Sequence, residues 1–279
     1  MLGYSTMREE YIAFHRKDGR GVCISEWEPH LEFFTGPFEN WLSGQPIKVF
    51  LERPNWVVAL RLPPTIGTSG ISPDRSAGYP VVLKRFGWRS PLHRIARHLT
   101  GSKAVRSFRI AMTLRNAGVA TPRPLIAWER SGLDSANQGY YITDEIPEAV
   151  TLRQWLKSSK VPEPEITALS MELARLVRGM HDAGVLHRDL TIGNFLVAPK
   201  PFEGNRIFLI DLSRAIHLGY VPLPLRLMDL ARMKLFNLWP AFFESYCVGH
   251  PDWMDWQPAL NFLIQVRRWK MDRWKKIKG

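Results

Sequence analysis

The amino-acid sequence predicts an α+β fold of two lobes, a strand-rich lobe over residues 1–146 and a helical lobe over residues 147–279. Short apolar runs bounded by Gly, Pro and Asn dominate the first half, a pattern typical of strands. Longer segments with helical period dominate the second half, and the change falls after Pro147. At 279 residues the chain is long enough for two lobes.

The first lobe is expected to hold several strands and one helix. Residues 1–46 show no clean period, so we expect irregular structure there, with a first strand near residues 21–27. A helix is expected over residues 102–117, because spaced apolar residues form one face and the segment stops at Gly118. Further strands are expected at residues 47–52, 55–62, 80–86, 125–129 and 140–146, with a turn at Arg53-Pro54 and a loop over residues 63–79.

The second lobe is expected to be mainly helical. Thr151 and Gln154 form a capping box that opens a short helix. A long helix is expected over residues 162–184, because it begins with acids, carries a continuous apolar face and ends at a glycine. Two short strands follow at residues 195–197 and 207–210, and helices are expected over residues 223–248 and 258–277.

The segment His187–Asn194, with the sequence HRDLTIGN, carries the chemistry. An aspartate, an asparagine five residues later, and a second aspartate after an apolar run form a pattern typical of phosphoryl transfer. Asp189 is the candidate base for a hydroxyl proton, since it lies on a loop after a long helix. Asn194 and Asp211 are the candidate Mg²⁺ ligands, because Mg²⁺ prefers hard oxygen donors. Each acid could instead be an ordinary loop or turn residue.

Three further residues could support such a site. Lys84, in an otherwise apolar strand, is a candidate phosphate anchor, or else an edge-strand lysine. His187 is expected to hold the loop by hydrogen bonds, and His181 to pack on the surface or against a loop. Asp229 interrupts an apolar helical run, so we expect it to be buried and to bind backbone amides of the loop, unless it lies on the helix surface.

The composition restricts compartment and partners. The formal net charge is +12, and ten Lys or Arg but no Asp or Glu lie from Lys84 to Trp128. Such a surface attracts phosphates, or serves only solubility. Two cysteines cannot form a disulfide framework, and no signal peptide or membrane span is evident, so we expect a cytoplasmic protein. No nucleic-acid recognition motif is present, and no nucleic-acid partner is expected.

These motifs resemble the protein-kinase-like superfamily and, within it, the bacterial lipopolysaccharide core kinases that phosphorylate Kdo or heptose. The resemblance implies the two-lobed kinase fold, ATP and Mg²⁺ as cofactors, and Lys84 as the anchor of the α- and β-phosphates. It implies that the backbone from Asp144 to Ile146 forms the adenine-binding hinge. The matching segments are VLK (82–84), LRNAGVAT (114–121), ITD (142–144), MHDAG (180–184), HRDLTIGN (187–194), IDLSRA (210–215) and Asp229-Leu230.

The chain departs from that pattern in the first lobe. Ser107 stands where the family usually has a glutamate that pairs with the lysine. No GxGxxG joins the first two strands, and the glycine-rich stretch Gly67–Gly70 comes after the second of them. Asp211 is followed by Leu-Ser and not by Phe-Gly. The sequence therefore leaves open a catalytically impaired pseudokinase that acts as a nucleotide-binding scaffold.

Two features favour a sugar over a peptide as the acceptor. Only 17 residues separate Asp211 from Asp229, too few for the usual peptide-docking segment, and Thr191 replaces the lysine expected in a Ser/Thr kinase. We therefore expect an ATP-dependent kinase acting on a sugar hydroxyl of lipopolysaccharide core or a related glycolipid, the alternative being an atypical protein kinase. The basic C-terminus, with Trp269 and Trp274, fits an anionic membrane surface, which would place the protein on the inner face of the inner membrane.

Overall fold

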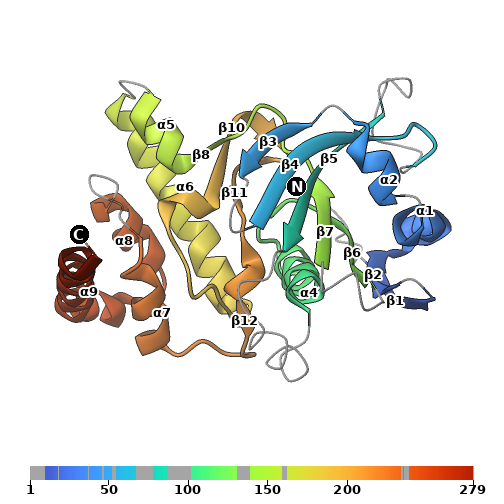
Figure 1. Ribbon diagram of the computed structural model, residues 1–279. Coiled ribbons are helices and arrows are strands. Elements are labelled where there is room, and N and C mark those ends of the chain that lie inside the picture. Colours follow the sequence, from blue (N-terminus) through green and yellow to red (C-terminus); the bar gives the residue numbers. More distant parts are fainter. Residues whose placement is uncertain are drawn as a thin grey trace, which may run out of the picture. The chain divides into compact units, whose positions relative to one another are not determined.

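The computed structural model divides into two compact units (Figure 1). The first comprises Met1–Asn116 and Pro122–Ile146, and the second comprises Ala117–Thr121 and Pro147–Gly279. The structure describes residues 10–17, 19–36, 38–45, 47–51, 55–66, 78–86, 102–130, 139–158, 162–233, 235 and 239–278. The predicted turn at Arg53-Pro54, the stretch Gly67–Gly70 and the side chain of Trp274 lie outside the described residues.

The first unit is built on a sheet of seven antiparallel strands in the order β1-β2-β6-β7-β5-β4-β3. In chain order these strands are Tyr11–Arg16 (β1), Gly19–Ile24 (β2), Lys48–Leu51 (β3), Asn55–Leu62 (β4), Tyr79–Phe86 (β5), Pro124–Arg130 (β6) and Gly139–Asp144 (β7). Helix α4 (Lys103–Asn116) packs on β6 and β7 (Figure 1). The five strands and the helix predicted after residue 46 are confirmed, with boundaries that shift by one or two residues.

Among the described residues up to 45, the expectation of irregular structure is wrong, whereas the first strand expected near residues 21–27 is confirmed as β2. The chain forms the hairpin β1–β2, the 3₁₀ helix η1 (Ser25–His30) and two short helices, α1 (Leu31–Thr35) and α2 (Phe38–Ser43). The helices have only five and six residues, too few to show a period or to be stable alone. Tertiary packing of their aromatic side chains stabilises them.

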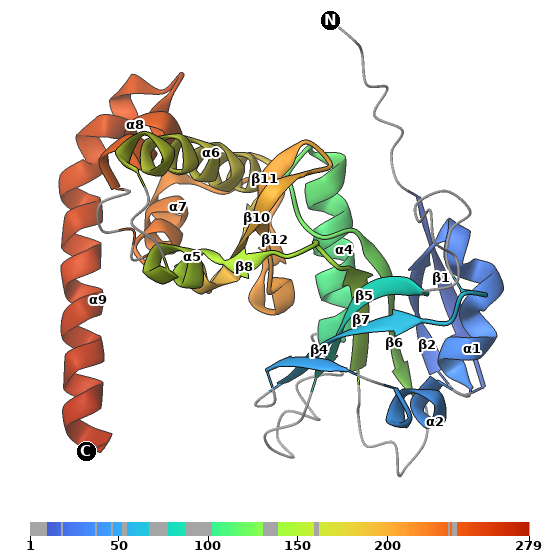
Figure 2. The ribbon, with the colours of Figure 1, turned by 90° about the horizontal axis from the view of Figure 1, so that it is seen from above.

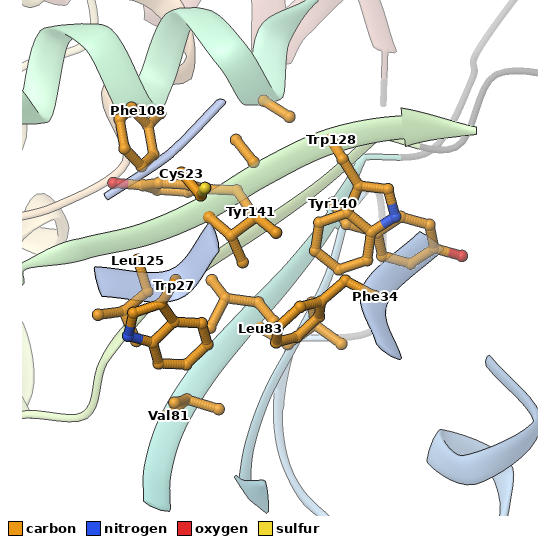
Figure 3. Close-up of a cluster of buried hydrophobic side chains, with 14 of the residues drawn as sticks. Cys23, Trp27, Phe34, Val81, Leu83, Phe108, Leu125, Trp128, Tyr140 and Tyr141 are labelled. Carbon is orange, nitrogen blue, oxygen red and sulfur yellow. The ribbon is translucent and has the colours of Figure 1, made fainter. Parts of the chain in front are cut away.

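Aromatic side chains form much of the core of the first unit (Figure 3). Trp128 stacks on Tyr140 across β6 and β7 with ring centroids 4.8 Å apart, and Phe38 of α2 meets Trp128 edge-on at 5.2 Å. Figure 3 shows Phe108 on the α4 side of the strands, and Trp27 and Phe34 on the opposite side. The residues after β2 therefore cover the sheet face that α4 leaves open.

The second unit is mainly helical, with small sheets at its candidate catalytic segment (Figure 2). Its α-helices are Leu152–Ser158 (α5), Glu163–Asp182 (α6), Leu223–Leu230 (α7), Trp239–Cys247 (α8) and Gln257–Lys278 (α9). One sheet joins Val150–Thr151 (β8), Phe195–Phe202 (β10) and Asn205–Leu209 (β11), and another joins Val185–Leu186 (β9) and Ile216–His217 (β12). Short 3₁₀ helices cover Ile192–Asn194 (η3), Leu212–Arg214 (η4) and Pro251–Trp256 (η6).

Local signals in the second half agree with the structure, with one exception. The capping box is confirmed, since the Gln154 amide donates to the Thr151 hydroxyl at 3.2 Å and the Thr151 amide donates to the Gln154 side chain at 3.0 Å. The long helix predicted over residues 162–184 is α6. The single helix predicted over residues 223–248 is wrong, because that stretch holds two separate helices, α7 and α8.

The segment Ala117–Thr121 belongs to the second unit although it leads into β6. The Leu209 amide donates to the Ala120 carbonyl at 2.9 Å, and the Thr121 hydroxyl donates to the Leu209 carbonyl at 2.7 Å. This turn is therefore tied to the end of β11, just before Asp211.

Two further observations concern the cysteines and the helices. Cys23 and Cys247 are buried free thiols, in agreement with the predicted lack of a disulfide framework. Within the described part of the chain, every helix is too short or too polar to cross a bilayer.

Candidate active site

The segment His187–Asn194 runs from the end of β9 to η3 in the second unit. Arg188 takes a left-handed conformation, with φ of 66°. The Asn194 side-chain amide donates to the Asp189 carbonyl at 2.7 Å, which closes the loop on itself. The Asp189 side chain is one-third exposed, so its carboxylate can meet a ligand while its backbone is held.

His187 links this loop to the segment that carries Asp211. Its Nδ1 accepts a hydrogen bond from the Asp189 amide at 3.3 Å, and its Nε2 lies 3.1 Å from the Ile210 carbonyl. Because Nδ1 accepts, Nε2 must carry the proton and donate. Burial lowers the pKa of the His187 imidazole, which favours this neutral form. The Ile210 amide donates in turn to the Asn194 carbonyl at 2.9 Å.

Asp229 of α7 binds the backbone at the start of the loop. Its side chain is 2% exposed, and its carboxylate oxygens accept hydrogen bonds from the His187 amide at 2.7 Å and the Arg188 amide at 2.9 Å. The sequence predicts this kind of partner for a buried acid. Burial alone would raise the pKa of the Asp229 carboxyl, but its contact with the His181 imidazole and the hydrogen bond from the His187 amide hold the pKa below its ordinary value.

His181 does not lie on the surface or against a loop, so that expectation is wrong. The residue is fully buried on α6, and its Nδ1 hydrogen-bonds to the Tyr246 hydroxyl of α8 at 2.7 Å. Its Nε2 lies 3.6 Å from the Asp229 carboxylate. Burial lowers the pKa of the His181 imidazole. The sequence shows no sign of this role, because Tyr246 and Asp229 lie far along the chain.

Asp211 follows β11 after one intervening residue and has a left-handed backbone, with φ of 57°. Its Oδ1 accepts a hydrogen bond from the Ser213 hydroxyl at 2.8 Å. The residue begins η4, and at the end of that turn Arg214 places its Nη1 3.1 Å from Asp189 Oδ2. Sequence analysis missed Arg214, although IDLSRA contains it.

Lys84 and the predicted hinge lie in the first unit. Lys84 pairs with Tyr141 across β5 and β7, and its ammonium lies 5.1 Å from the centroid of the Phe86 ring. Phe86 and Ala104 of α4 both lie within 4 Å of the place where a Cβ on Gly139 would stand. Since residues two apart on a strand share a face, Lys84 projects from the sheet face that α4 covers.

Hydrogen bonds fix the hinge residues at the end of β7. The Asp144 amide donates to the Arg123 carbonyl at 3.0 Å, and the Asp144 carboxylate accepts from the Tyr79 hydroxyl at 2.8 Å. Burial and the neighbouring carboxylate raise the pKa of the Tyr79 hydroxyl, so it stays a donor. Ile146 is buried, 5% exposed.

Ser107 of α4 is buried, and its hydroxyl donates to the Lys103 carbonyl one turn earlier at 2.8 Å. The position that the resemblance assigns to a glutamate thus holds a side chain bonded within its own helix. Between Lys84 and Glu129 the sequence contains no acid, so α4 offers no carboxylate.

The donor set of the second unit suits Mg²⁺. With the Asn194 nitrogen donating to the Asp189 carbonyl, the amide oxygen is left to accept, and Asp211 adds a carboxylate. These are two hard oxygen ligands, and phosphate and water oxygens would have to complete the shell. No group of three or more His, Cys, Asp or Glu occurs among the described residues, so a cage made by protein alone is absent there.

Comparison with known proteins agrees with this reading of the motifs. Residues 88–243 match the model of the "Lipopolysaccharide kinase (Kdo/WaaP) family", which is more than half of the chain. A Vibrio parahaemolyticus 3-deoxy-D-manno-octulosonic acid kinase is 33% identical over 114 residues, 40% of this chain and 44% of the relative. The Pseudomonas aeruginosa lipopolysaccharide core heptose(I) kinase WaaP is 34% identical over 169 residues, 56% of this chain and 61% of the relative.

The fold of this chain is also similar to that of a solved structure. A structure of WaaP in complex with acyl carrier protein superposes with a TM-score of 0.60 at 23% sequence identity, covering 87% of this chain and 96% of that one. It confirms the predicted protein-kinase-like α+β fold. The chain spans about half the length of the curated relatives it matches. On the extent of the family match, the chain belongs to the lipopolysaccharide kinase (Kdo/WaaP) family.

Proposed function

We propose that this protein is an ATP-dependent kinase that phosphorylates a sugar hydroxyl of lipopolysaccharide core or of a related glycolipid. The observation that carries the proposal is the state of Asp189. Its backbone is fixed by Asn194 and His187, while its carboxylate stays one-third exposed. Family membership and the names of the relatives support a sugar acceptor.

In the proposed reaction the acceptor hydroxyl binds with its hydrogen directed at the Asp189 carboxylate. The hydroxyl oxygen attacks the γ-phosphorus of ATP, the bond from that phosphorus to the bridging oxygen breaks, and ADP leaves. The hydroxyl proton passes to Asp189. Asn194 and Asp211 would hold Mg²⁺, which neutralises charge on the phosphates. In this scheme His187 and Asp229 keep the loop in shape.

Nucleotide binding is assigned to the first unit. Lys84 would contact the α- and β-phosphates, as the family resemblance implies. The backbone from Asp144 to Ile146 would bind the adenine, and the hydrogen bonds of Asp144 with the Arg123 carbonyl and the Tyr79 hydroxyl would keep that backbone in place.

The segment from Asp211 to Asp229 favours a sugar over a peptide. It comprises η4, the two-residue strand β12 and most of α7. This leaves no long segment on which an extended peptide could lie. A scaffold without catalysis is the second candidate, and the observation that favours it is Ser107 in place of an acid.

The outer face of α9 supports a peripheral membrane location on the cytoplasmic side. Phe262 and Trp269 lie two helical turns apart, and 63% and 56% of these residues are exposed. The Arg273 guanidinium lies 4.9 Å from the centre of the Trp269 ring. Aromatic rings beside cations on one helix face fit the interface of an anionic bilayer.

Transfer of labelled γ-phosphate from ATP by the purified protein tests the proposed function. The acceptors are core lipopolysaccharide, Kdo-lipid A and a generic protein. Asp189→Asn is expected to lower the rate about 10²- to 10⁴-fold, the usual contribution of such a group. Asp272→Asn, at an exposed acid of α9, is the matched control and should keep the wild-type rate.

Three other outcomes would contradict part of this proposal. Undiminished transfer by Asp189→Asn contradicts the assigned base. Labelling of the generic protein alone indicates an atypical protein kinase. Normal ATP binding with no labelled acceptor indicates the scaffold.

Flotation with lipid vesicles tests the membrane location. Wild-type protein should float with phosphatidylcholine vesicles that contain phosphatidylglycerol, and not with phosphatidylcholine alone. The double variant Phe262→Ser, Trp269→Ser should lose at least about tenfold in binding, since each ring no longer enters the interface. Tyr220→Ser, at another exposed aromatic residue, should bind normally. Equal flotation of both variants contradicts the assignment of α9.

A further inference from the structure

Three arginines from separate elements lie near Asp189 and Asp229. Arg214 ends η4, Arg232 follows α7, and Arg267 lies on α9. Arg214 Nη1 lies 3.1 Å from Asp189 Oδ2, and Arg232 Nε lies 3.7 Å from Asp229 Oδ1. All of these residues belong to the second unit.

Three guanidinium groups are close to the carboxylates of Asp189 and Asp229. Both oxygens of Asp229 already accept backbone amides, and the buried Arg232 Nε has no hydrogen-bond partner among the described residues. Burial and the charge of Arg232 lower the pKa of the Arg267 guanidinium, against the attraction of Asp189 and Asp229. Each guanidinium therefore raises the electrostatic free energy of the other charged guanidinium groups, and a bound anion would lower that energy.

Arg214 is the member of this group that a ligand can reach. Its side chain is 63% exposed, while that of Arg232 is 27% exposed. A guanidinium carries five N–H donors, and Nη1 alone faces Asp189. The remaining donors can bind a phosphate or carboxylate by paired hydrogen bonds. The loop itself supplies no cation after the aspartate, since Leu190-Thr191-Ile192-Gly193 is uncharged.

We propose that Arg214, backed by Arg232 and Arg267, forms an anion subsite next to Asp189 that binds a phosphate or carboxylate group on the acceptor. The subsite rests on the proposed function, because it takes the acceptor to be a sugar whose hydroxyl gives its proton to Asp189 during phosphorylation. In the free protein Arg214 holds the Asp189 carboxylate in one orientation. When the acceptor binds, its anionic group takes the other donors and brings the hydroxyl toward Asp189.

Steady-state kinetics with matched acceptors test the subsite. The acceptors are de-O-acylated core oligosaccharide, the same oligosaccharide after phosphatase treatment, and a carboxyl-reduced form, so that the arms separate phosphate from carboxylate. Arg214→Ala is expected to raise KM about ten- to a hundredfold for the acceptor that keeps the recognised group. KM for ATP should stay within about twofold. The variant should not change KM for the acceptor that lacks the group.

Further variants separate charge from geometry. Arg214→Lys keeps the charge without the paired donors and should give an intermediate KM. Arg267→Gln should shift KM in the same direction as Arg214→Ala. Arg175→Ala, at an exposed arginine of α6 outside the group, is the matched control and should behave as wild type.

Three results would overturn the subsite. The first is an equal fall in kcat for all acceptors, which would make Arg214 only a positioning residue for Asp189. The second is a rise in KM for ATP alone, which would make it a nucleotide contact. The third is faster transfer by Arg214→Ala, which would make the ion pair an inhibitory lock.

Calorimetry without ATP tests the subsite even if no phosphoryl transfer occurs. Failure of the subsite can therefore be distinguished from failure of the proposed function. Wild-type protein should bind the untreated oligosaccharide more tightly than the treated forms, and Arg214→Ala should abolish the difference. Equal affinity of the wild type for all three, or no binding of any, overturns the subsite.

Discussion

The two units hold their key residues in different ways. In the first, aromatic rings such as Trp128 and Tyr140 pack around the strand of Lys84, and shape complementarity fixes the sheet. In the second, the segment with Asp189 is held by the hydrogen bonds that its amides donate to the buried Asp229 and by the bond between the buried His187 ring and the Ile210 carbonyl. Packing tolerates many substitutions of similar volume, whereas a buried polar group needs a particular partner. Substitutions should therefore affect stability in the first unit and both stability and transfer in the second.

The largest expected effect is on the aromatic core. Trp128→Ala removes a fully buried ring that stacks on Tyr140 and meets Phe38, so it should lower the free energy of unfolding by about 3–5 kcal/mol. Hydrogen exchange followed by mass spectrometry should show the fastest new exchange in peptides of the first unit. Trp56→Ala, at a half-buried tryptophan of β4, is the control and should cost less. Equal acceleration in both units would contradict packing as the local determinant.

A smaller loss of stability with a larger loss of activity is expected at Asp229. Asp229→Asn keeps the volume but replaces one acceptor oxygen by a donor that faces the His187 or Arg188 amide. One buried amide then lacks a partner, which should cost about 2 kcal/mol. Phosphoryl transfer should fall by more than this loss explains, at a temperature where the variant is folded. If denaturant unfolding changed and transfer did not, the network would serve stability alone.

Acid should weaken the second unit first. The pKa values of His181 and His187 are lowered by burial, so the unfolded chain binds protons more readily than the folded chain below about pH 6.5. Stability is therefore full above this pH and falls as the pH decreases, by up to about 1.4 kcal/mol per pH unit for each histidine. His181→Gln should remove about half of this slope. Urea unfolding at pH 8 to 5 measures it, and an unchanged slope would contradict the assignment to His181.

Much of the fold is predictable from sequence because its signals are local. Strand β4, helix α4 and the Thr151–Gln154 capping box depend on a period or a spacing within a few residues. Helices α1 and α2 could not be predicted, because Phe34 and Phe38 are held by contacts with Trp128, about 90 residues away. The break between α7 and α8 was missed because apolar residues continue through it.

The candidate site likewise combines residues that local spacing indicates with contacts between distant parts of the sequence. Asp189, Asn194 and Asp211 can be proposed from the sequence, because their spacing is a property of one stretch of chain. The contacts of His181 with Tyr246, and of Arg214 with Asp189, cannot be proposed in this way. The first joins two helices far apart in sequence, and the second depends on the left-handed backbone of Asp211 that starts η4. Neither geometry can be derived from spacing.

The smallest expected effect is at Ser107, where the family resemblance leads one to expect a large one. The Ser107 hydroxyl donates to the Lys103 carbonyl. In an α-helix that carbonyl also accepts a hydrogen bond from the backbone amide one turn later. Alanine loses this bond but gains helix propensity, so Ser107→Ala should change the free energy of unfolding by less than about 0.5 kcal/mol. Transfer should stay within about twofold of wild type.

Thr113→Ala is the matched control, because the Thr113 hydroxyl makes the same kind of bond to the Arg109 carbonyl on the exposed side of α4. The two variants should behave alike in urea unfolding and in transfer assays. Such equality would mean that the Ser107 hydroxyl contributes nothing to the chemistry. A tenfold loss of transfer in Ser107→Ala alone would instead make the serine a working substitute for the glutamate.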